Sequence, residues 1–262
     1  MPAALDLSLD ADHAADYGKR QEERRVTVTR RGAFGLALAL AVAGTLPAAA
    51  QSVDRWEREV AAFEAADRAS APPRGEIVFV GSSTIRLWDL NASFPELKTI
   101  NRGIISSEMS DAVRLVDRLV TPYAPRIVVV YAGDNDIMGI PSEQITIGFE
   151  RFVRAVHARL PATRILYIGI KPSLLRWGQV DRMRLANVMI EQFCERDDRL
   201  GFVDVDHALL GWDEKPRPEL YVEDGLHLSA AGYQILTALV RPYLTSTSSP
   251  IQNSEVRSQK QP

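Results

Sequence analysis

Five apolar runs rich in β-branched residues recur along the body of the chain, and longer amphipathic segments separate them. The runs cover residues 76–80, 97–100, 126–131, 164–170 and 201–205. Continuous apolar runs of this length are typical of strands that are buried on both faces, as in a parallel sheet. The alternation of such strands with helices predicts a three-layer α/β/α sandwich built on a five-stranded parallel sheet.

The segments between these runs carry apolar side chains at helical spacing. An opening helix is expected near residues 53–66, and Ser142 and Ser229 are expected to cap two later helices. The other apolar positions at helical spacing are Met109, Val113, Val116 and Val120, then Ile145, Phe149, Phe152, Val156 and Leu160, then the segment 180–196, and finally Tyr233, Leu236, Val240 and Tyr243.

Residues 1–50 have the order of an export signal that follows a long polar leader. Arg30 and Arg31 precede an apolar stretch over residues 33–46, and Pro47-Ala48-Ala49-Ala50 offers the small residues that a signal peptidase needs. The apolar stretch is shorter than the roughly 20 residues of an ordinary membrane span. We therefore expect a periplasmic or secreted protein without a membrane span after signal removal, exported by the general or the twin-arginine route. A retained membrane anchor is the alternative.

The remaining chain is predicted to form one domain over residues 51–244, followed by a disordered tail over 245–262 that is rich in Ser, Gln and Thr. The formal net charge is −3 and the body of the chain contains no basic block, so nucleic-acid binding is not expected. Cys194 is the single cysteine, which excludes an internal disulfide, and its apolar surroundings indicate a buried, inert thiol. The sequence does not indicate an oligomeric state.

Four polar residues and one glycine follow three of the predicted strands or precede the last helix. Ser83 follows the first strand, Gly103 the second and Asn135 the third, whereas Asp224 and His227 lie just before the last helix. In open parallel sheets, ligands bind at the carboxyl ends of the strands. All five residues are therefore expected at one edge of the sheet.

These residue types match the requirements of acyl transfer, which needs a nucleophile, a base, a group that orients the base, and donors for an oxyanion. Asp224 and His227 are three residues apart, so one turn places both side chains on the same side. A carboxylate that accepts from Nδ1–H leaves Nε2 free to take a proton from a serine such as Ser83. Each motif also has an ordinary interpretation, because Gly-Ser-Ser-Thr forms turns and a loop Asp often caps a helix.

Other residues compete for these roles. Ser82 and Thr84 are alternative hydroxyl groups, and His207 is an alternative base. Asp134 and Asp136, with Asp204, Asp206 and a histidine, suggest an oxygen-rich metal site and hence a metal-dependent phosphoesterase. No recognised metal-ligand spacing is present, so neither a metal nor another cofactor is expected.

The ordered set of motifs resembles the SGNH hydrolases, a subfamily of the GDSL-type esterases and lipases. The motifs are Gly81-Ser82-Ser83-Thr84-Ile85, Asn101-Arg102-Gly103, Gly133-Asp134-Asn135-Asp136 and Asp224-Gly225-Leu226-His227. The likeness spans roughly residues 76–240. Ser82 stands where the family typically has Asp, which puts the loop geometry and the pH profile in question. The Gly-Ser-Ser start resembles the platelet-activating-factor acetylhydrolase-like branch.

The resemblance implies a flavodoxin-like sandwich without a metal. It also implies Ser83 as the nucleophile, His227 as the base oriented by Asp224, and an oxyanion hole formed by the Ser83 N–H, the Gly103 N–H and the Asn135 amide.

The family hydrolyses lipid esters, acetylated sugars, aryl esters and thioesters, so the fold does not select a substrate. The chain has no long apolar lid segment, which favours short acyl groups such as acetyl, on a glycan, lipid or other small-molecule ester. The fourth strand is followed by Lys171, Arg176 and Trp177. These side chains are expected either to contact a polar or anionic acyl group or, more simply, to pack and solvate a loop. A non-catalytic carbohydrate- or lipid-binding module is the remaining alternative.

Overall fold

The computed structural model describes residues 48–245, with side chains from Trp56 onward. The expected leader and apolar signal segment, and all of the expected tail except Thr245, lie outside the described residues. The first described helix, α2, spans Ala48–Ala69 and extends the expected opening helix at both ends.

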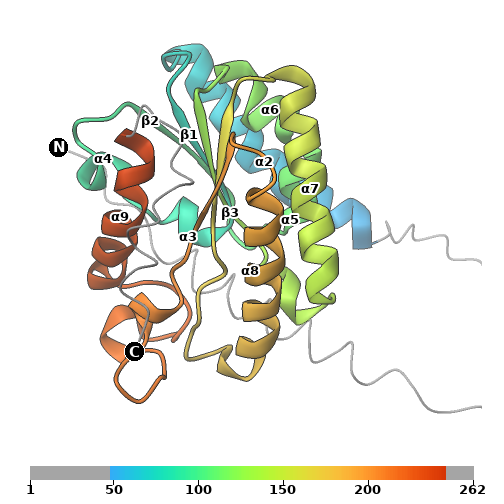
Figure 1. The fold of residues 1–262 in the computed structure, drawn as a ribbon. Helices are drawn as coiled ribbons and strands as arrows, with labels where there is room; N and C mark the ends of the chain where they lie inside the picture. The colour runs from blue at the N-terminus through green and yellow to red at the C-terminus, as the bar shows by residue number, and fades with distance from the viewer. Residues whose placement is uncertain (1–47, 246–262) are drawn as a thin grey trace, which may run out of the picture. The chain divides into compact units, whose positions relative to one another are not determined.

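The sheet has five parallel strands in the order β2-β1-β3-β4-β5, which confirms the predicted fold class (Figure 1). The strands are β1 (Ile77–Gly81), β2 (Thr99–Gly103), β3 (Ile127–Tyr131), β4 (Arg164–Ile168) and β5 (Leu200–Val203). This is the flavodoxin-like order, in which the direction of strand addition reverses between β1 and β3 and ligands bind at that point.

Successive side chains of each strand enter two different hydrophobic cores, because strand side chains alternate between the faces of a sheet. In β3, Val128 and Val130 belong to one core, whereas Val129 and Tyr131 belong to the other. Helices cover both faces, so nearly every strand residue is buried. This double cover explains why the strands form continuous apolar runs rather than alternating patterns.

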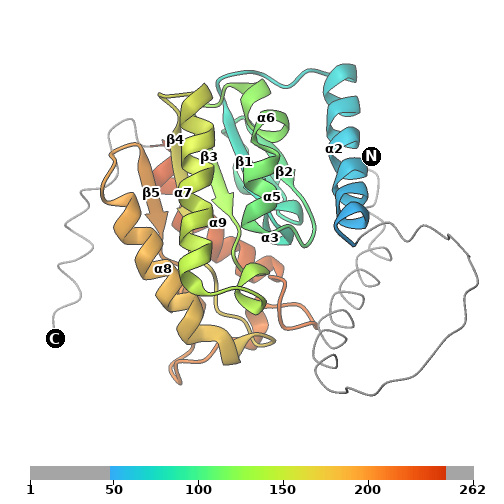
Figure 2. The same cartoon turned by 90° about the vertical axis from the view of Figure 1, so that its right-hand side faces the viewer.

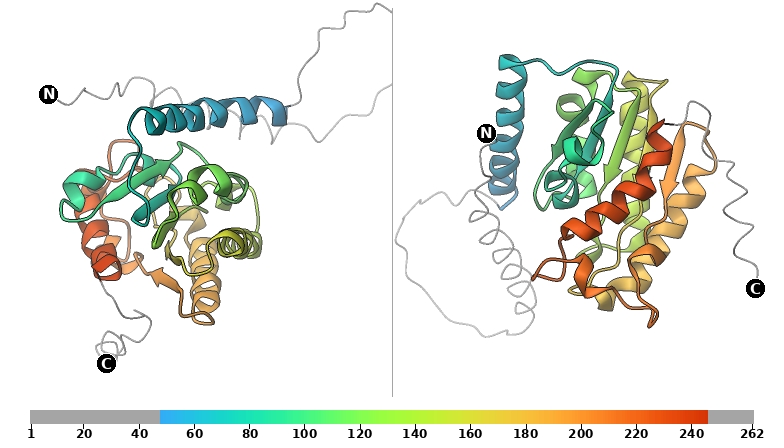
Figure 3. Two further views of the ribbon diagram at one scale, coloured as in Figure 1. Left: turned by 90° about the horizontal axis from the view of Figure 1, so that it is seen from above. Right: turned by 90° about the vertical axis from the view of Figure 1, so that its left-hand side faces the viewer.

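The first face is covered by α2 and four further helices (Figure 2). These four are α5 (Met109–Arg114), α6 (Val116–Leu119), α7 (Ser142–Arg159) and α8 (Val180–Cys194). The second face is covered by α3 (Ser83–Arg86), α4 (Leu90–Ser93) and α9 (Ala230–Thr245), and α9 crosses the sheet in the right-hand view of Figure 3. In the described residues no helix has both the length and the apolar composition needed to cross a membrane.

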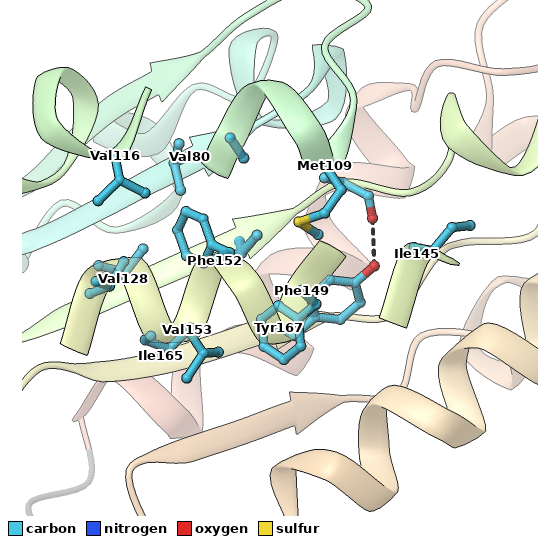
Figure 4. Close-up of a cluster of buried hydrophobic side chains, with 14 of the residues drawn as sticks. Val80, Met109, Val116, Val128, Ile145, Phe149, Phe152, Val153, Ile165 and Tyr167 are labelled. Atoms are coloured by element: carbon cyan, nitrogen blue, oxygen red, sulfur yellow. Dashed lines mark hydrogen bonds between the residues drawn. The ribbon is translucent and has the colours of Figure 1, made fainter. Parts of the chain in front are cut away.

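Aromatic side chains fill the first core between α7 and the sheet (Figure 4). The rings of Phe149 and Tyr167 lie 4.8 Å apart between centroids, and Phe152 packs into the same cluster. Burial of each such side chain contributes about 1.5–3 kcal/mol. The Tyr167 hydroxyl, otherwise an unpaired polar group in this core, donates to the Ala132 carbonyl oxygen at 2.5 Å.

Two helix predictions were wrong in detail. The expected helix through Met109 and Val120 is divided, because Leu115 leaves helical geometry between α5 and α6. Ser142 is not the N-cap of α7 but its first residue, after Pro141. The Ser142 hydroxyl donates instead to the Arg182 carbonyl oxygen at 2.8 Å, so a tertiary partner replaces the local cap.

The start of α9 agrees with its prediction, because the Ser229 hydroxyl accepts from the Gly232 N–H at 3.3 Å. Five short 3₁₀ helices lie in the connections between the described strands and helices: η1 (Thr121–Tyr123), η2 (Asp136–Met138), η3 (Trp177–Gln179), η4 (His207–Leu209) and η5 (Pro218–Leu220).

Candidate active site

A tight turn joins β1 to α3 and presents Ser83. Gly81 has φ +139, and a Cβ there would lie 1.9 Å from the Tyr131 carbonyl oxygen, so only glycine fits. The next N–H, that of Ser82, donates to the same oxygen at 3.0 Å. Ser82 and Thr84 are each 2% exposed, whereas Ser83 is only partly buried. The turn therefore buries both competing hydroxyl residues and leaves Ser83 at the surface of the site.

His227 and Asp224 complete a hydrogen-bonded chain to Ser83. His227 Nε2 lies 3.0 Å from Ser83 Oγ, and His227 Nδ1 lies 2.5 Å from Asp224 Oδ2. The other carboxylate oxygen, Asp224 Oδ1, accepts from the backbone N–H groups of Leu226 and His227 at 2.8 and 2.9 Å. Gly225, with φ +65, allows the loop to fold around the carboxylate in this way.

The carboxylate of Asp224 is held in its ionised form. Burial acts to raise the pKa of Asp224, but hydrogen bonds from the His227 ring and from the Leu226 and His227 N–H groups outweigh it, so the pKa lies below its usual value. An ionised acceptor at Nδ1 keeps the proton on that nitrogen and leaves Nε2 as the acceptor that faces Ser83 Oγ. The three side chains have the geometry that removal of a proton from a serine requires.

Asn135 follows β3 and is buried, with 7% of its surface exposed. Its Nδ2 donates to the Ser107 carbonyl oxygen at 3.0 Å, and its Oδ1 accepts from Arg176 Nη2 at 3.1 Å. The amide therefore has a defined orientation at the carboxyl edge of the sheet.

Gly103 lies at the end of β2, beside Gly81 in the parallel register. A Cβ at Gly103 would lie 2.3 Å from the Arg86 backbone nitrogen, so this glycine allows β2 to pack directly against α3. Its N–H donates to Asn101 Oδ1 at 2.9 Å. The structure thus places Gly103 at the predicted edge, but with the N–H expected for an oxyanion already bonded to a side chain.

A buried ion cluster lies behind Asn135 and was missed by sequence analysis. Asp134 accepts from Lys171 Nζ at 3.0 Å, from Arg176 Nη1 at 2.5 Å and from the Tyr131 hydroxyl at 3.0 Å. Burial acts to raise the pKa of Asp134, but the two cations outweigh it and hold the pKa well below its usual value. Lys171 and Arg176 are 2% and 6% exposed, so they bind Asp134 rather than solvent. Only the position of Lys171 at the end of an apolar run hinted at burial.

In the part of the chain that the structure describes, the residues that suggested a metal site do not gather into one, and the alternative base, His207, is exposed. The side chain of His207 is 78% exposed, and its Nδ1 lies 3.9 Å from Asp206 Oδ2. Asp136 accepts from the Met109 N–H, and Asp204 accepts from the Asp206 N–H. Within residues 48–245, no group of three or more His, Cys, Asp or Glu side chains is placed to hold a metal ion.

Cys194, the single cysteine, is buried and chemically inert. Cys194 is 2% exposed, as predicted, and burial raises the pKa of its thiol to about 12. A thiol with so high a pKa is a poor nucleophile.

Comparison with known families gives one match that spans most of the folded part. Residues 86–235, more than half of the chain, match the model of the GDSL-like lipase/acylhydrolase family. No curated protein matches the sequence significantly.

Three solved structures illustrate the same fold. A platelet-activating-factor-like protein from Streptococcus pneumonia is 23% identical, with a TM-score of 0.65 over 75% of this chain and 98% of its own. A GDSL-like lipase from Bacteroides thetaiotaomicron is 18% identical, with a TM-score of 0.60 over 71% of this chain and 96% of its own. An acetyl-xylooligosaccharide esterase from Geobacillus stearothermophilus is 18% identical, with a TM-score of 0.55 over 66% of this chain and 96% of its own. At these identities the likeness is one of fold.

Proposed function

The chain belongs to the GDSL-like lipase/acylhydrolase family of ester hydrolases, and on that premise we propose that it is an exported serine esterase for short-acyl esters of carbohydrates or lipids. The observation that carries the serine mechanism is the continuous hydrogen-bonded chain from Asp224 through His227 to Ser83, with contacts of 2.5 and 3.0 Å. Nucleophile, base and orienting carboxylate come from two distant parts of the sequence and meet at the strand-order reversal.

The proposed reaction proceeds through an acyl-enzyme. Ser83 Oγ attacks the ester carbonyl carbon while His227 Nε2 takes the hydroxyl proton. The tetrahedral intermediate then expels the alkoxide, which receives that proton from His227. In the second half, a water molecule transfers a proton to His227 and attacks the acyl carbon, and Ser83 leaves with the proton as the free acid forms. Asp224 stays ionised and stabilises the imidazolium in both halves.

The negative charge on the carbonyl oxygen requires donors close to Ser83. We assign this role to the Ser83 N–H and to the Asn135 amide, and Gly103 would join them only by giving up its bond to Asn101 Oδ1. Replacement of Asn135 by Ala is expected to lower kcat by roughly 10²–10³-fold, the usual effect of losing one oxyanion donor.

A short acyl group is the proposed substrate feature. The sequence of residues 51–244 contains no long apolar lid segment, and a protein of the same fold is an acetyl-xylooligosaccharide esterase. Both observations support an acetyl ester. Leu174 and Leu175 are 40% and 64% exposed, and the Leu175 N–H donates to the Gly225 carbonyl oxygen at 3.0 Å, inside the loop of Asp224 and His227. These apolar side chains offer a contact surface for the acyl or the leaving group beside the base.

Export to the periplasm or the medium is the proposed location, based on the signal-like order of residues 1–50. Secretion by a bacterial host and sequencing of the mature N-terminus tests it. A start near Gln51 supports export, and an intact Met1 contradicts it.

Turnover of p-nitrophenyl esters from acetyl to dodecanoyl tests the activity. We expect a maximum at acetyl or propionyl and a fall in kcat on the order of 10⁴-fold or more in Ser83→Ala. Retained activity in Ser83→Ala would contradict the serine mechanism. Tight binding of acetylated sugars by a wild type that hydrolyses no ester would favour the binding-module alternative.

A further inference from the structure

Arg176 connects the buried ion cluster to the amide of the site. Its Nη1 donates to Asp134 Oδ1 at 2.5 Å and to the Asp134 carbonyl oxygen at 2.6 Å, while its Nη2 donates to Asn135 Oδ1 at 3.1 Å. The guanidinium group is planar, so anchoring Nη1 on Asp134 fixes the direction in which Nη2 points.

This contact determines which end of the Asn135 amide faces the site. A carboxamide has an accepting oxygen at one end and a donating nitrogen at the other, and a guanidinium group can only donate. Oδ1 must therefore turn towards Arg176, and Nδ2 turns away from it, towards the Ser107 carbonyl oxygen at 3.0 Å. If the amide were flipped, its Nδ2 donor would face the Arg176 Nη2 donor, and no hydrogen bond could form between them.

Asp134, which holds Arg176 in place, is itself buried and has further hydrogen-bond partners. Asp134 also binds Lys171 and the Tyr131 hydroxyl, so its position does not depend on Arg176 alone. On the other side, the segment that carries Arg176 is joined to the base: the Leu175 N–H donates to the Gly225 carbonyl oxygen at 3.0 Å. The segment between Lys171 and Arg176 thus contacts the oxyanion side and the base side of the site together.

We propose that Arg176 is a positioning residue that holds the Asn135 carboxamide with Nδ2 as the donor to the oxyanion. This proposal rests on the proposed esterase function. The charges of the cluster support the same role of Arg176. Asp134, Lys171 and Arg176 together carry one net positive charge, and this charge lies behind the Asn135 amide. In a buried environment that charge polarises the amide and strengthens its N–H donor towards an anion.

The test compares the single and double variants of Arg176 and Asn135 in p-nitrophenyl acetate hydrolysis by the full chain. Arg176→Met removes the contact, and Arg176→Lys keeps a cation for Asp134 but cannot bind both carboxylate and amide in the guanidinium geometry. Arg184→Met is the matched control, because Arg184 lies on α8, is 40% exposed and pairs with Asp206. Rates are divided by the concentration of sites that a fluorophosphonate labels at completion, which removes any loss of folded protein.

We expect both Arg176 variants to lower kcat by about 10- to 100-fold, with KM changed by less than about threefold, because the contact acts on the transition state. In the Asn135→Ala background, Arg176→Met should lower kcat by less than about threefold further, since Arg176 acts through that amide. Arg184→Met should keep the wild-type kcat.

Two results would overturn the proposal. One is a loss in the double variant equal to the product of the two single losses, which would mean that Arg176 acts independently of Asn135. The other is wild-type kcat per labelled site in Arg176→Lys. Neither is confused with failure of the esterase function itself, which would show as a wild type without turnover or as full activity in Ser83→Ala.

Discussion

Asp136 is a buried carboxyl group whose protonation should make the stability of this protein depend on pH. It is 3% exposed, and both its oxygens lie 3.0–3.1 Å from the Met109 backbone nitrogen at the start of α5. Burial, and to a smaller degree the charge of Glu108, raise the pKa of Asp136 from 3.8 to about 7, although the Met109 N–H acts in the opposite direction. The folded protein therefore holds this proton at pH values where the unfolded chain has lost it.

The sign and size of the effect follow from proton linkage. Between about pH 4 and pH 7 the folded state binds more protons at Asp136 than the unfolded state, so the free energy of unfolding falls as pH rises. At about 1.36 kcal/mol per pH unit, the difference between 3.8 and about 7 corresponds to at most about 4 kcal/mol. Below about pH 4 Asp136 is protonated in both the folded and the unfolded state, so its contribution to stability is fully present. Above about pH 7 it is ionised in both states, so that contribution is lost.

Asp136→Asn removes this proton while keeping an oxygen that accepts from the Met109 N–H. Chemical denaturation at pH 4.5 and pH 8 gives the free energy of unfolding of wild type and variant. We expect the variant to gain about 2–4 kcal/mol relative to wild type on going from pH 4.5 to pH 8, whatever constant cost the buried Nδ2 adds. The control Asp117→Asn, whose side chain is 61% exposed, should change stability by less than about 0.5 kcal/mol at either pH. An equal difference between Asp136→Asn and wild type at both pH values would refute the reasoning.

Three further outcomes are expected from the site and the core. Asp224→Asn should lower kcat by about 10³–10⁴-fold in the ester assay, because an amide stabilises the wrong His227 tautomer; a loss below tenfold would contradict this role. Gly81→Ala should lower the free energy of unfolding by more than about 4 kcal/mol in denaturant titration, because its Cβ would overlap the Tyr131 carbonyl oxygen; wild-type stability would show that the turn rearranges. The Cys194 thiol should react with Ellman's reagent only after unfolding, since it is 2% exposed; rapid reaction of the native protein would contradict its burial.

The fold was predictable because burial on both faces leaves a strong signal in the strands. All five strands were found, with ends that differ by up to three residues. The largest difference is at the end of β2, which continues to Gly103 although the apolar run ends at Ile100. At the end of β4 the opposite holds, because Gly169 and Ile170 continue the apolar run although the strand ends at Ile168. Hydropathy records burial, whereas a strand ends where its ladder of hydrogen bonds ends.

The placement of Ser83, Asp224 and His227 in one hydrogen-bonded chain was also predictable, because parallel strands deliver their following loops to one edge. Asn101 was not predicted as the partner of the Gly103 N–H. In that contact the Asn101 side chain accepts from a backbone N–H two residues further along the chain. The sequence does not show which rotamer the side chain adopts, so the contact could not be predicted.

Lys171 and Arg176 could not be placed from the sequence for a related reason. A lone cation after a strand is usually solvated, and burial becomes favourable only when a carboxylate is brought to it. Asp134 follows β3, and Lys171 follows the neighbouring strand β4, 37 residues further along the chain, so the pair exists only in the folded chain.

The central claim is that Ser83 is the nucleophile, and covalent labelling tests it most directly. Wild-type protein and Ser83→Ala are incubated with a fluorophosphonate, digested, and mapped by tandem mass spectrometry. The account predicts one phosphonylated residue, Ser83, with no label in Ser83→Ala. A label on Ser82, Thr84 or any other residue of active wild-type protein, or turnover with no label at all, would contradict it.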